Sequence, residues 1–385
     1  MDPEGHWLLS ANNNTGGVLW PLHSKYPRVL ESQSIYVSIA FTPDGRSLVS
    51  TSEDTVRLWP LSPAAGETYR TLMEDGNGDL SSTPAVDPLG RYVLVNSYGY
   101  PRVFLISLTG GETKQMPGFT RGEGWVFAMA FSPDGRLAFA AGDRPAILRI
   151  WDLETAEVRK LDLRKGREPC RGEAEPQVDS LEVLTNNKFL TADKWGIRAW
   201  NLDEETSEEI RPCQGVKGEY SLLSLDPTRS RLLILDRKPT EGISALTLYD
   251  LTAKTFREIR SHGNRVSAIA LDPTGTIAVT GDLDGVVRVG PITGEEPHLL
   301  FADAQAISSV AVSPDGKWIA SGSQDGTIRL WPMPEGTPFH TLPYEELLNR
   351  IRSMTNLRVV PDESSGTGYR VEIGPFPGWA KLPEW

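Results

Sequence analysis

The stretch that decides the fold is ISSVAVSPDGKWIASGSQDGTIRLW, residues Ile307–Trp331. Apolar residues alternate with small or polar ones on both sides of its Pro-Asp-Gly turn, which is the period of two that half-buried strands require. A polar loop, Ser-Gln-Asp-Gly, separates the second strand from a third that ends at Trp331. The segment therefore predicts three consecutive strands joined by short turns.

The proline turn recurs along the chain at a nearly fixed spacing. It is found at seven prolines, namely Pro3, Pro43, Pro88, Pro133, Pro227, Pro273 and Pro314. Neighbouring turns are 40 to 46 residues apart, except for one interval of 94 residues that holds two periods. Several are followed by a tryptophan that ends the third strand, at Trp20, Trp59, Trp151 and Trp331. A repeat of this length with a terminal tryptophan predicts the blades of an all-β propeller.

Two copies of the repeat carry a family resemblance. FSPDGRLAFAAG…LRIWDL, residues Phe131–Leu153, and the copy at Ile307–Trp331 resemble the blades of WD-repeat β-propellers. The resemblance covers roughly residues 1–342 and implies four-stranded blades around a central channel. The copies at Val178–Leu202 and Tyr220–Leu251 are degenerate, since the first lacks the proline turn and the second carries an inserted loop.

The resemblance also implies a buried polar network of His, Ser or Thr, Asp and Trp within each blade, which is structural rather than reactive. This sequence matches the network only in part. The matching residues are His262, Thr280 and Asp284 in one repeat and Ser321, Asp325 and Trp331 in the last. Gly290 stands where the first of these repeats would have its tryptophan.

The number of blades depends on residues 1–32, which match a blade without its first strand. An incomplete blade leaves an open strand edge unless another segment pairs with it. We expect Tyr369–Ile373 to complete it, which gives eight blades, with Pro27–Glu31 as its fourth strand. The alternative is seven blades with an N-terminal remnant. A start inside a blade also suggests that the polypeptide is part of a longer chain.

Residues 343–385 form the second predicted region. Leu347, Leu348, Ile351 and Met354 are spaced as on one face of a short helix. The stretch Met354–Trp379 resembles the tail that follows the propeller in many bacterial WD-repeat proteins, often linked to serine/threonine kinases. This implies an accessory propeller of a signalling protein, although the chain has no kinase motif. The region either packs on the propeller rim or docks a neighbouring domain.

Composition excludes several classes of function. A net charge of −12 argues against nucleic acid as the main ligand. Cys170 and Cys213 are the only cysteines, so we expect no disulfide framework and a reducing, cytoplasmic location. No apolar run approaches 18 residues and no export signal opens the chain, so no membrane association is expected.

We expect no catalysis and no cofactor. The five histidines are scattered singly, without a spacing that would bind a metal. The first strands of the repeats, which line the channel, contain SIAF, AMAF, LLSL, AIAL and SVAV, with acids only at their margins, at Asp79, Asp179 and Glu219. We therefore predict a protein-interaction scaffold. The alternatives are a propeller hydrolase or lactonase that uses the channel, and a self-association module.

A candidate partner-binding face follows from the topology, which places the loops between second and third strands and those between blades on one side. The predicted residues are Tyr98, Tyr100, Arg102, Trp125, Arg144, Trp195, Arg237 and Lys238. Aromatic and Arg side chains dominate binding hot spots, and a basic sector would suit an acidic or phosphorylated peptide. Alternatively, Trp195 folds over its own blade and the cations are ordinary solvated residues.

Overall fold

A computed structural model describes most of the chain. The described residues are 7–12, 16–21, 28–32, 37–62, 69–75, 80, 83–97, 102–111, 113–119, 124–142, 146–167, 177–213, 220–238, 243–263, 265–301, 305–347, 357–361 and 369–373. For residues 7–12, 16–21, 220, 238, 357–361 and 369–373 the description covers the backbone only.

Seven four-stranded antiparallel sheets, here called blades 1 to 7, account for most of the strands in these described residues. Blade 1 consists of β4 (Ser38–Phe41), β5 (Ser47–Thr51), β6 (Thr55–Pro60) and β7 (Arg70–Glu74). Blade 2 consists of β8 (Ala85–Val86), β9 (Tyr92–Ser97), β10 (Arg102–Ser107) and β11 (Lys114–Gln115). Blade 3 consists of β12 (Val126–Phe131), β13 (Leu137–Gly142), β14 (Ile147–Asp152) and β15 (Val158–Asp162). Blade 4 consists of β16 (Val178–Thr185), β17 (Lys188–Asp193), β18 (Gly196–Asn201) and β19 (Thr206–Pro212). Blade 5 consists of β20 (Tyr220–Leu225), β21 (Arg231–Lys238), β22 (Ile243–Asp250) and β23 (Thr255–Ile259). Blade 6 consists of β24 (Val266–Leu271), β25 (Ile277–Asp282), β26 (Val286–Pro291) and β27 (His298–Phe301). Blade 7 consists of β28 (Ile307–Val312), β29 (Trp318–Ser323), β30 (Thr327–Pro332) and β3 (Arg28–Glu31).

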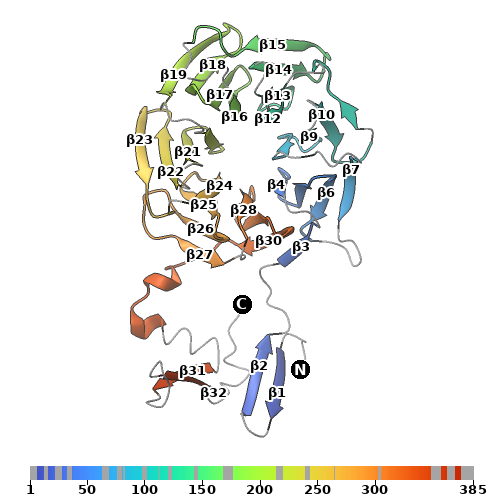
Figure 1. The fold of residues 1–385 in the computed structure, drawn as a ribbon. Coiled ribbons are helices and arrows are strands. Elements are labelled where there is room, and N and C mark those ends of the chain that lie inside the picture. The colour runs from blue at the N-terminus through green and yellow to red at the C-terminus, as the bar shows by residue number, and fades with distance from the viewer. Residues whose placement is uncertain are drawn as a thin grey trace. The chain divides into compact units, whose positions relative to one another are not determined.

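The blades form a closed ring. The first strand of each blade contacts the first strand of the next, in the order β4, β8, β12, β16, β20, β24 and β28, and β28 returns to β4. Figure 1 shows these inner strands around the centre and the fourth strands at the rim. The chain is therefore a seven-bladed β-propeller. The insertion predicted in the repeat at Tyr220–Leu251 lengthens β21 and β22, which pair as far as Lys238 and Ile243.

Blade 7 is closed by a strand from the other end of the repeat region. β3 is the outer strand next to β30, and the Ser32 backbone N–H donates to the Gly326 carbonyl at 2.8 Å. Leu30 on β3 is buried in a cluster with residues of blades 1 and 7, including Ile39 and Leu330. Joining the first and last segments of the ring in one blade removes the open edge that β30 would otherwise present.

The expected eight-bladed ring is wrong. Tyr369–Ile373 is a strand, β32, but it pairs with β31 (Leu357–Pro361) rather than with the N-terminal residues. The N-terminal strands β1 (Trp7–Asn12) and β2 (Gly16–Pro21) pair with each other. The segment Pro27–Glu31, predicted to be the fourth strand of the first blade, nearly coincides with β3. However, β3 belongs to the last blade. Since β3 already pairs with β30, seven blades close the ring without a further strand.

The chain divides into two compact units, one made of Met1–Arg28 and Pro334–Trp385 and the other of Val29–Met333. The second unit holds the propeller, apart from the first residue of β3. The first unit contains the two hairpins β1–β2 and β31–β32 and a 3₁₀ turn at Phe339–Thr341. A helix begins at Tyr344, where the Leu347 backbone N–H donates to the Pro343 carbonyl. The remaining residues of the predicted amphipathic helix, from Leu348 onward to Met354, lie outside the described residues.

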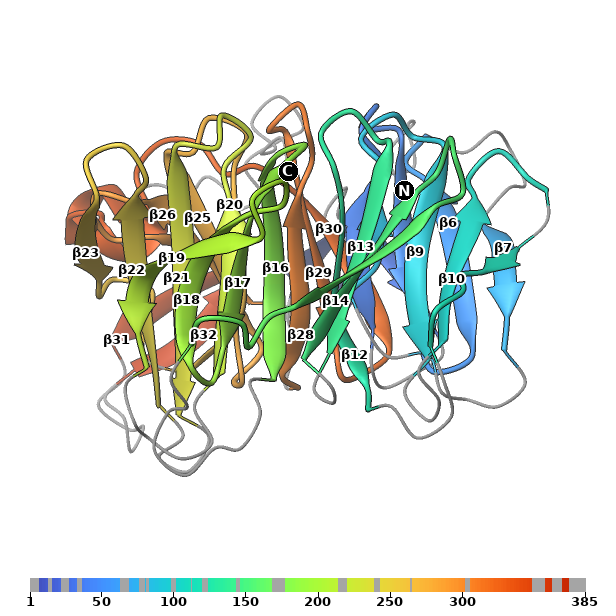
Figure 2. The same ribbon diagram turned by 90° about the horizontal axis from the view of Figure 1, so that it is seen from above.

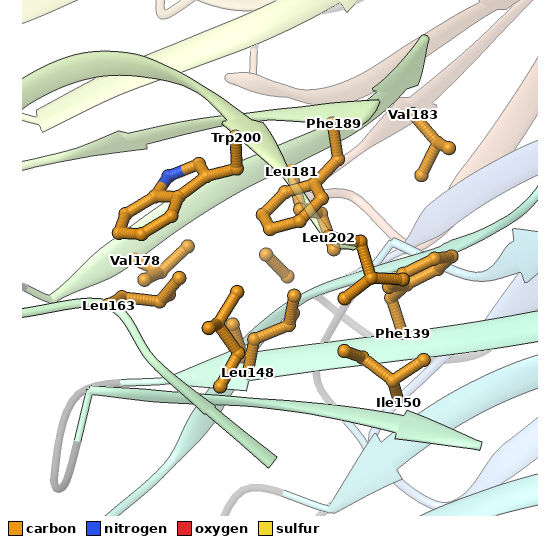
Figure 3. Close-up of a cluster of buried hydrophobic side chains, with 13 residues drawn as sticks. Phe139, Leu148, Ile150, Leu163, Val178, Leu181, Val183, Phe189, Trp200 and Leu202 are labelled. Atoms are coloured by element: carbon orange, nitrogen blue, oxygen red, sulfur yellow. The ribbon is translucent and has the colours of Figure 1, made fainter. Parts of the chain in front are cut away.

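Hydrophobic clusters between neighbouring blades hold the ring together. In the cluster between blades 3 and 4, the rings of Phe189 and Trp200 stack with their centroids 6.1 Å apart. Phe139 from blade 3 lies against Phe189 with a ring centroid distance that is also 6.1 Å. Figure 3 shows these side chains within the cluster. Aromatic side chains bury large apolar areas, and each such pair adds about 0.5–1.5 kcal/mol beyond that burial. Packing of this kind contributes to the stability of both blades.

The repeated turn has a local physical cause, seen clearly in blade 7. The Ser313 hydroxyl donates to the Asp315 carboxylate at 2.6 Å and accepts the Trp318 backbone N–H at 2.9 Å. Gly316 has a φ of +70°, and its N–H donates to the Ser313 carbonyl. A side chain is strained at that φ, so the glycine of Pro-Asp-Gly is what permits the turn.

Tryptophans on the third strands donate to hydroxyls on the second strands. The indole N–H of Trp331 donates to Ser321 at 3.1 Å, that of Trp59 to Ser50 at 2.8 Å, and that of Trp200 to Thr191 at 2.9 Å. In blade 3 the indole N–H of Trp151 instead donates to the Pro117 carbonyl at 2.8 Å. Every one of these buried donors therefore has an acceptor, as buried polar groups require.

Blade 6 contains the other matched set of network residues. His262 is fully buried, and its Nδ1 lies 3.0 Å from the Thr280 hydroxyl. Burial lowers the pKa of His262 to about 4, so the ring is neutral at pH 7. Asp284 pairs with Arg265 at 2.5 Å on the surface, while Asp282 accepts the Val286 backbone N–H that closes the loop. In blade 7, Asp325 accepts from the backbone and hydroxyl of Thr327.

Replacing Ser321 with alanine is expected to lower the free energy of unfolding by about 1–3 kcal/mol, the cost of a buried donor left without its acceptor. Trp331 is buried, so water does not readily replace the lost hydroxyl. Denaturant unfolding measures the effect. The exposed Thr252→Ala variant is the control and should change stability by less than about 0.5 kcal/mol. Equal stability of S321A and the wild type would contradict this role of the hydroxyl.

Candidate functional site

The two faces of the propeller differ in what they present. Strands alternate in direction, so the turns between first and second strands gather on one face. The loops between second and third strands, together with the connections between blades, gather on the other, which we call the loop face. Figure 2 views the ring edge-on, with connections at both ends of the upright strands. The turns repeat from blade to blade, whereas the loop face varies and is better suited to recognition.

The structure describes only part of the predicted partner-binding set. Tyr98, Tyr100 and Arg144 lie outside the described residues, and of Lys238 only the backbone is described. Arg102 pairs with Asp75 at 3.2 Å and also donates to the Ser97 hydroxyl. Arg237 lies on β21 opposite Tyr220 and Ser244. Arg102 thus joins blade 2 to the strand end of blade 1, which gives it a structural role.

Trp195 is buried, so its indole is not an exposed contact on the loop face. Its ring lies 5.2 Å from the guanidinium carbon of Arg167, and its backbone N–H donates to Asp193 at 2.7 Å. Arg167 and Asp193 form a bidentate ion pair at 2.7 and 2.8 Å, with side chains 2% and 0% exposed. Burial raises the pKa of Asp193 although Arg167 opposes that change. The three residues fix the connection between blades 3 and 4.

Trp125 is the predicted residue that the structure does present to solvent, with 41% of its surface exposed. Its ring packs edge-on against Phe127, with centroids 6.1 Å apart. The backbone beside it is held closely: an added Cβ on Gly142 would lie 1.8 Å from the Trp125 carbonyl oxygen, and Asn96 donates to the Val126 carbonyl at 2.6 Å. Trp125 therefore sits on a rigid base.

Six described arginines at or near the loop face pair with carboxylates. The pairs are Arg102–Asp75, Arg167–Asp193, Arg211–Asp236, Arg265–Asp284, Arg288–Asp282 and Arg329–Asp325. Most join neighbouring strands or blades. A guanidinium that is already paired gives less net energy to an incoming phosphate or carboxylate, because the existing pair must be broken or shared.

The central channel holds a cavity of about 220 Å³. We call it the channel cavity; its lining residues come from or next to the first strands of blades 2 to 7 and include Phe127, Met129, Asp179, Ser180, Glu182, Leu222, Ser267, Ser308 and Ser309. Asp179 and Glu182 both lie on β16. Asp179 accepts a hydrogen bond from Gln177 on Oδ1 at 2.9 Å. Its other oxygen, Oδ2, is buried and finds no hydrogen-bond partner among the described residues.

Both carboxyl groups are strongly perturbed. Burial raises the pKa of Asp179 to about 8, with a smaller increase from the charge of Asp193. Burial raises the pKa of Glu182 to about 8 as well. The backbone hydrogen bond from Leu225 and the charge of Arg229 both lower this pKa, but their effect is smaller than that of burial. At pH 7 both groups are therefore predominantly protonated when the cavity holds no cation.

The expectation of a small and apolar channel missed Glu182. Asp179 was named only as a marginal acid, and Asp79 and Glu219 lie outside the described residues. The sequence feature that could have indicated these acids is the stretch VDSLEVLT, residues Val178–Thr185, in the repeat that lacks the proline turn. A β-bulge at Val178–Ser180 shifts the register there, so Asp179 and Glu182 both line the channel although they are three residues apart.

Two findings concern metals and cysteines. No group of three or more His, Cys, Asp or Glu side chains within the described part of the chain is arranged to hold a metal ion. Cys213 is disulfide-bonded, whereas the sequence predicts no disulfide framework, and Cys170, the other cysteine, lies outside the described residues. Since disulfides persist in oxidising compartments, this bond weighs against the expected cytoplasmic location. No described helix is long and apolar enough to cross a membrane.

Comparison with known families agrees with the repeat boundaries. A family profile described as "WD domain, G-beta repeat" matches residues 25–60, 114–152, 253–289 and 295–332. Each match begins near the fourth strand of one blade and continues through the first three strands of the next, as β3 to β6 do in the first match. The same offset explains why β3 completes blade 7. The chain is a seven-bladed β-propeller that contains WD40 repeats.

Proposed function

We propose that the chain is a non-catalytic protein-interaction scaffold that recognises its partner through the loop face. WD40 propellers typically serve as such scaffolds. The observation that carries the proposal for this chain is Trp125, an exposed aromatic side chain on a rigid base that packs against Phe127, a residue of the channel cavity lining. Aromatic side chains of this kind lose little conformational entropy on binding and dominate interface energies.

We further propose that the propeller serves a bacterial signalling protein as its accessory or sensory part. The support is the resemblance of Met354–Trp379 to tails that follow propellers linked to serine/threonine kinases. An acidic or phosphorylated partner remains a prediction. The ion pairing of the described arginines, such as Arg102 with Asp75 and Arg265 with Asp284, counts against it.

Replacing Trp125 with alanine is expected to abolish or strongly reduce capture of the partner from a lysate of the source cell. Loss of an exposed aromatic hot spot costs about 2 kcal/mol or more, which is roughly a thirtyfold change in affinity. The matched control is Phe301→Ala, which removes a more exposed aromatic ring from the rim strand β27. Equal capture by W125A and the wild type would exclude Trp125 from the interface.

A second candidate function is hydrolysis of a small ester or lactone in the channel, which the two inward carboxyl groups favour. A carboxyl with a pKa of about 8 is a suitable general acid at neutral pH. Turnover of ester or lactone substrates that Asp179→Asn abolishes would support this candidate. Concentration-dependent mass without a foreign partner would instead indicate the self-association module.

A further inference from the structure

We propose that the channel cavity binds the cationic end of a lysine or arginine side chain from the partner protein. The inference rests on the proposed function, because the cationic group comes from the partner that the loop face recognises. It names the chemistry of that partner as basic, in contrast to the acidic or phosphorylated peptide expected from the sequence.

The size of the cavity suits one side chain. Its 220 Å³ is about seven times the volume of one water molecule in the liquid, roughly 30 Å³. It is smaller than the roughly 300–1,000 Å³ of sites that enclose drug-sized ligands or cofactors. An amine or guanidinium on an alkyl stem matches this space and the mixture of apolar and acidic lining.

The serine hydroxyls that line the cavity are already used in joining blades. Ser267 donates to the Ile307 carbonyl at 2.5 Å, and Ser308 donates to the Val37 carbonyl at 2.6 Å. Ser180 accepts the Leu223 backbone N–H at 3.1 Å, and Ser309 accepts that of Ile39 at 3.3 Å. The carboxyl groups of Asp179 and Glu182 are therefore the acidic groups that the lining offers to a cation, and no described residue hydrogen-bonds the buried Oδ2 of Asp179.

The lining contains acids and no bases. None of the lysines, arginines or histidines in the described residues contributes to the cavity wall. The strands packed against β16 are β12, β13, β17 and β20. Of these, β12 and β13 contain no charged residue and β20 contains only Tyr220 as a titratable group, whereas β17 carries Lys188 and Asp193. A cation entering the cavity thus meets carboxyl groups and the ring of Phe127, both of which attract it.

The charges outside the cavity wall do not neutralise the two acids. Lys194 lowers the pKa of Asp179 only slightly and Arg229 does the same for Glu182, while burial dominates both. Arg229 is engaged elsewhere, since its Nε donates to the Val183 carbonyl at 3.2 Å. A bound ammonium or guanidinium would supply the missing counter-charge and favour the ionised carboxylates.

Proton release is the consequence that distinguishes this site from an apolar pocket. Each carboxyl with a pKa near 8 must lose its proton to pair with the cation. A lysine side chain, with a pKa of about 10.4, stays charged across this range. Affinity should therefore rise with pH, by roughly 25-fold between pH 6.5 and 8.5 for each carboxyl that ionises on binding.

The test is calorimetric titration of the full chain with three probes. Two are tripeptides with blocked termini, Gly-Lys-Gly and its norleucine analogue Gly-Nle-Gly, and the third is spermidine. We expect binding of the lysine peptide, no binding of the norleucine peptide, and tighter binding at pH 8.5. Asp179→Asn should weaken binding about tenfold or more, whereas Asp284→Asn, an equivalent change outside the cavity, should not. Glu182→Gln provides a second, independent variant, and thermal unfolding shows whether each variant is folded.

Several results would overturn the proposal. Equal binding of the norleucine peptide would mean an apolar pocket, and pH-independent affinity would mean that the carboxyl groups do not pair with the ligand. Binding of spermidine without the peptide would assign the cavity to a free polyamine. Failure of all three probes while Trp125→Ala still abolishes partner capture would reject the channel site and leave the scaffold function standing.

Discussion

Replacing Arg167 with leucine is expected to lower the free energy of unfolding by about 3–5 kcal/mol, because it leaves Asp193 buried without its partner. The side chains of this pair are 2% and 0% exposed. The same substitution also removes the cation beneath the Trp195 ring. Urea or thermal unfolding measures the change. The matched control is Arg260→Leu, because Arg260 pairs with Glu258 on the surface with its side chain 84% exposed; that loss should be at most about 1 kcal/mol.

The effect of R167L should depend on pH. Burial holds the pKa of Asp193 above its ordinary value, so the folded protein binds a proton there more tightly than the unfolded chain. Stability therefore falls as pH rises through the folded pKa, and without Arg167 that pKa should increase further. The loss should be smaller at pH 5 than at pH 8. Combining Arg167→Met with Asp193→Asn should recover most of the stability, and failure to do so would show that packing, not charge, explains the single variant.

Replacing Leu30 with alanine is expected to cost about 2–5 kcal/mol, the range for removing a large apolar side chain from a packed site. Leu30 is 7% exposed on β3, where it joins the first blade to the last. Val29 is the natural control, since it is the neighbouring residue on the same strand and is 47% exposed. Val29→Ala should change the free energy of unfolding by less than about 0.5 kcal/mol.

A stronger version of this test removes the pairing itself. Leu30→Pro eliminates a backbone donor and distorts β3, so β30 would become an open edge. We expect a lower unfolding midpoint than in L30A, together with concentration-dependent association through the exposed edge. If L30P unfolded like the wild type, the ring would not depend on β3 for its closure.

Much of the propeller was predictable from local pattern. The Pro-Asp-Gly turn, the period of two and the terminal tryptophan are short-range features, because each depends on neighbouring residues and on the φ that Gly316 adopts. The strand at Tyr369–Ile373 was also predicted, yet its partner was not. The partner of a strand from a distant segment depends on which strand edges remain open after the ring has closed. Local sequence patterns therefore do not predict that partner.

The candidate site was predictable in a smaller part. Trp125 and Trp195 look equivalent in the sequence, each in a loop of the same face, but one is exposed and the other is buried over Arg167. The difference comes from Asp193, whose carboxylate holds both the guanidinium and the Trp195 backbone. The acidic character of the channel was likewise hidden, because a β-bulge in β16 decides which residues line the channel.

The sequence by itself determined that this protein is built from repeated blades, since each blade is specified by turn chemistry and alternation within about 45 residues. Only the tertiary structure decided that there are seven, that β3 closes the last blade, and that Asp179 and Glu182 share one cavity. Closure, burial and the resulting pKa values depend on contacts between residues far apart in the chain. Those contacts exist only once the ring has formed.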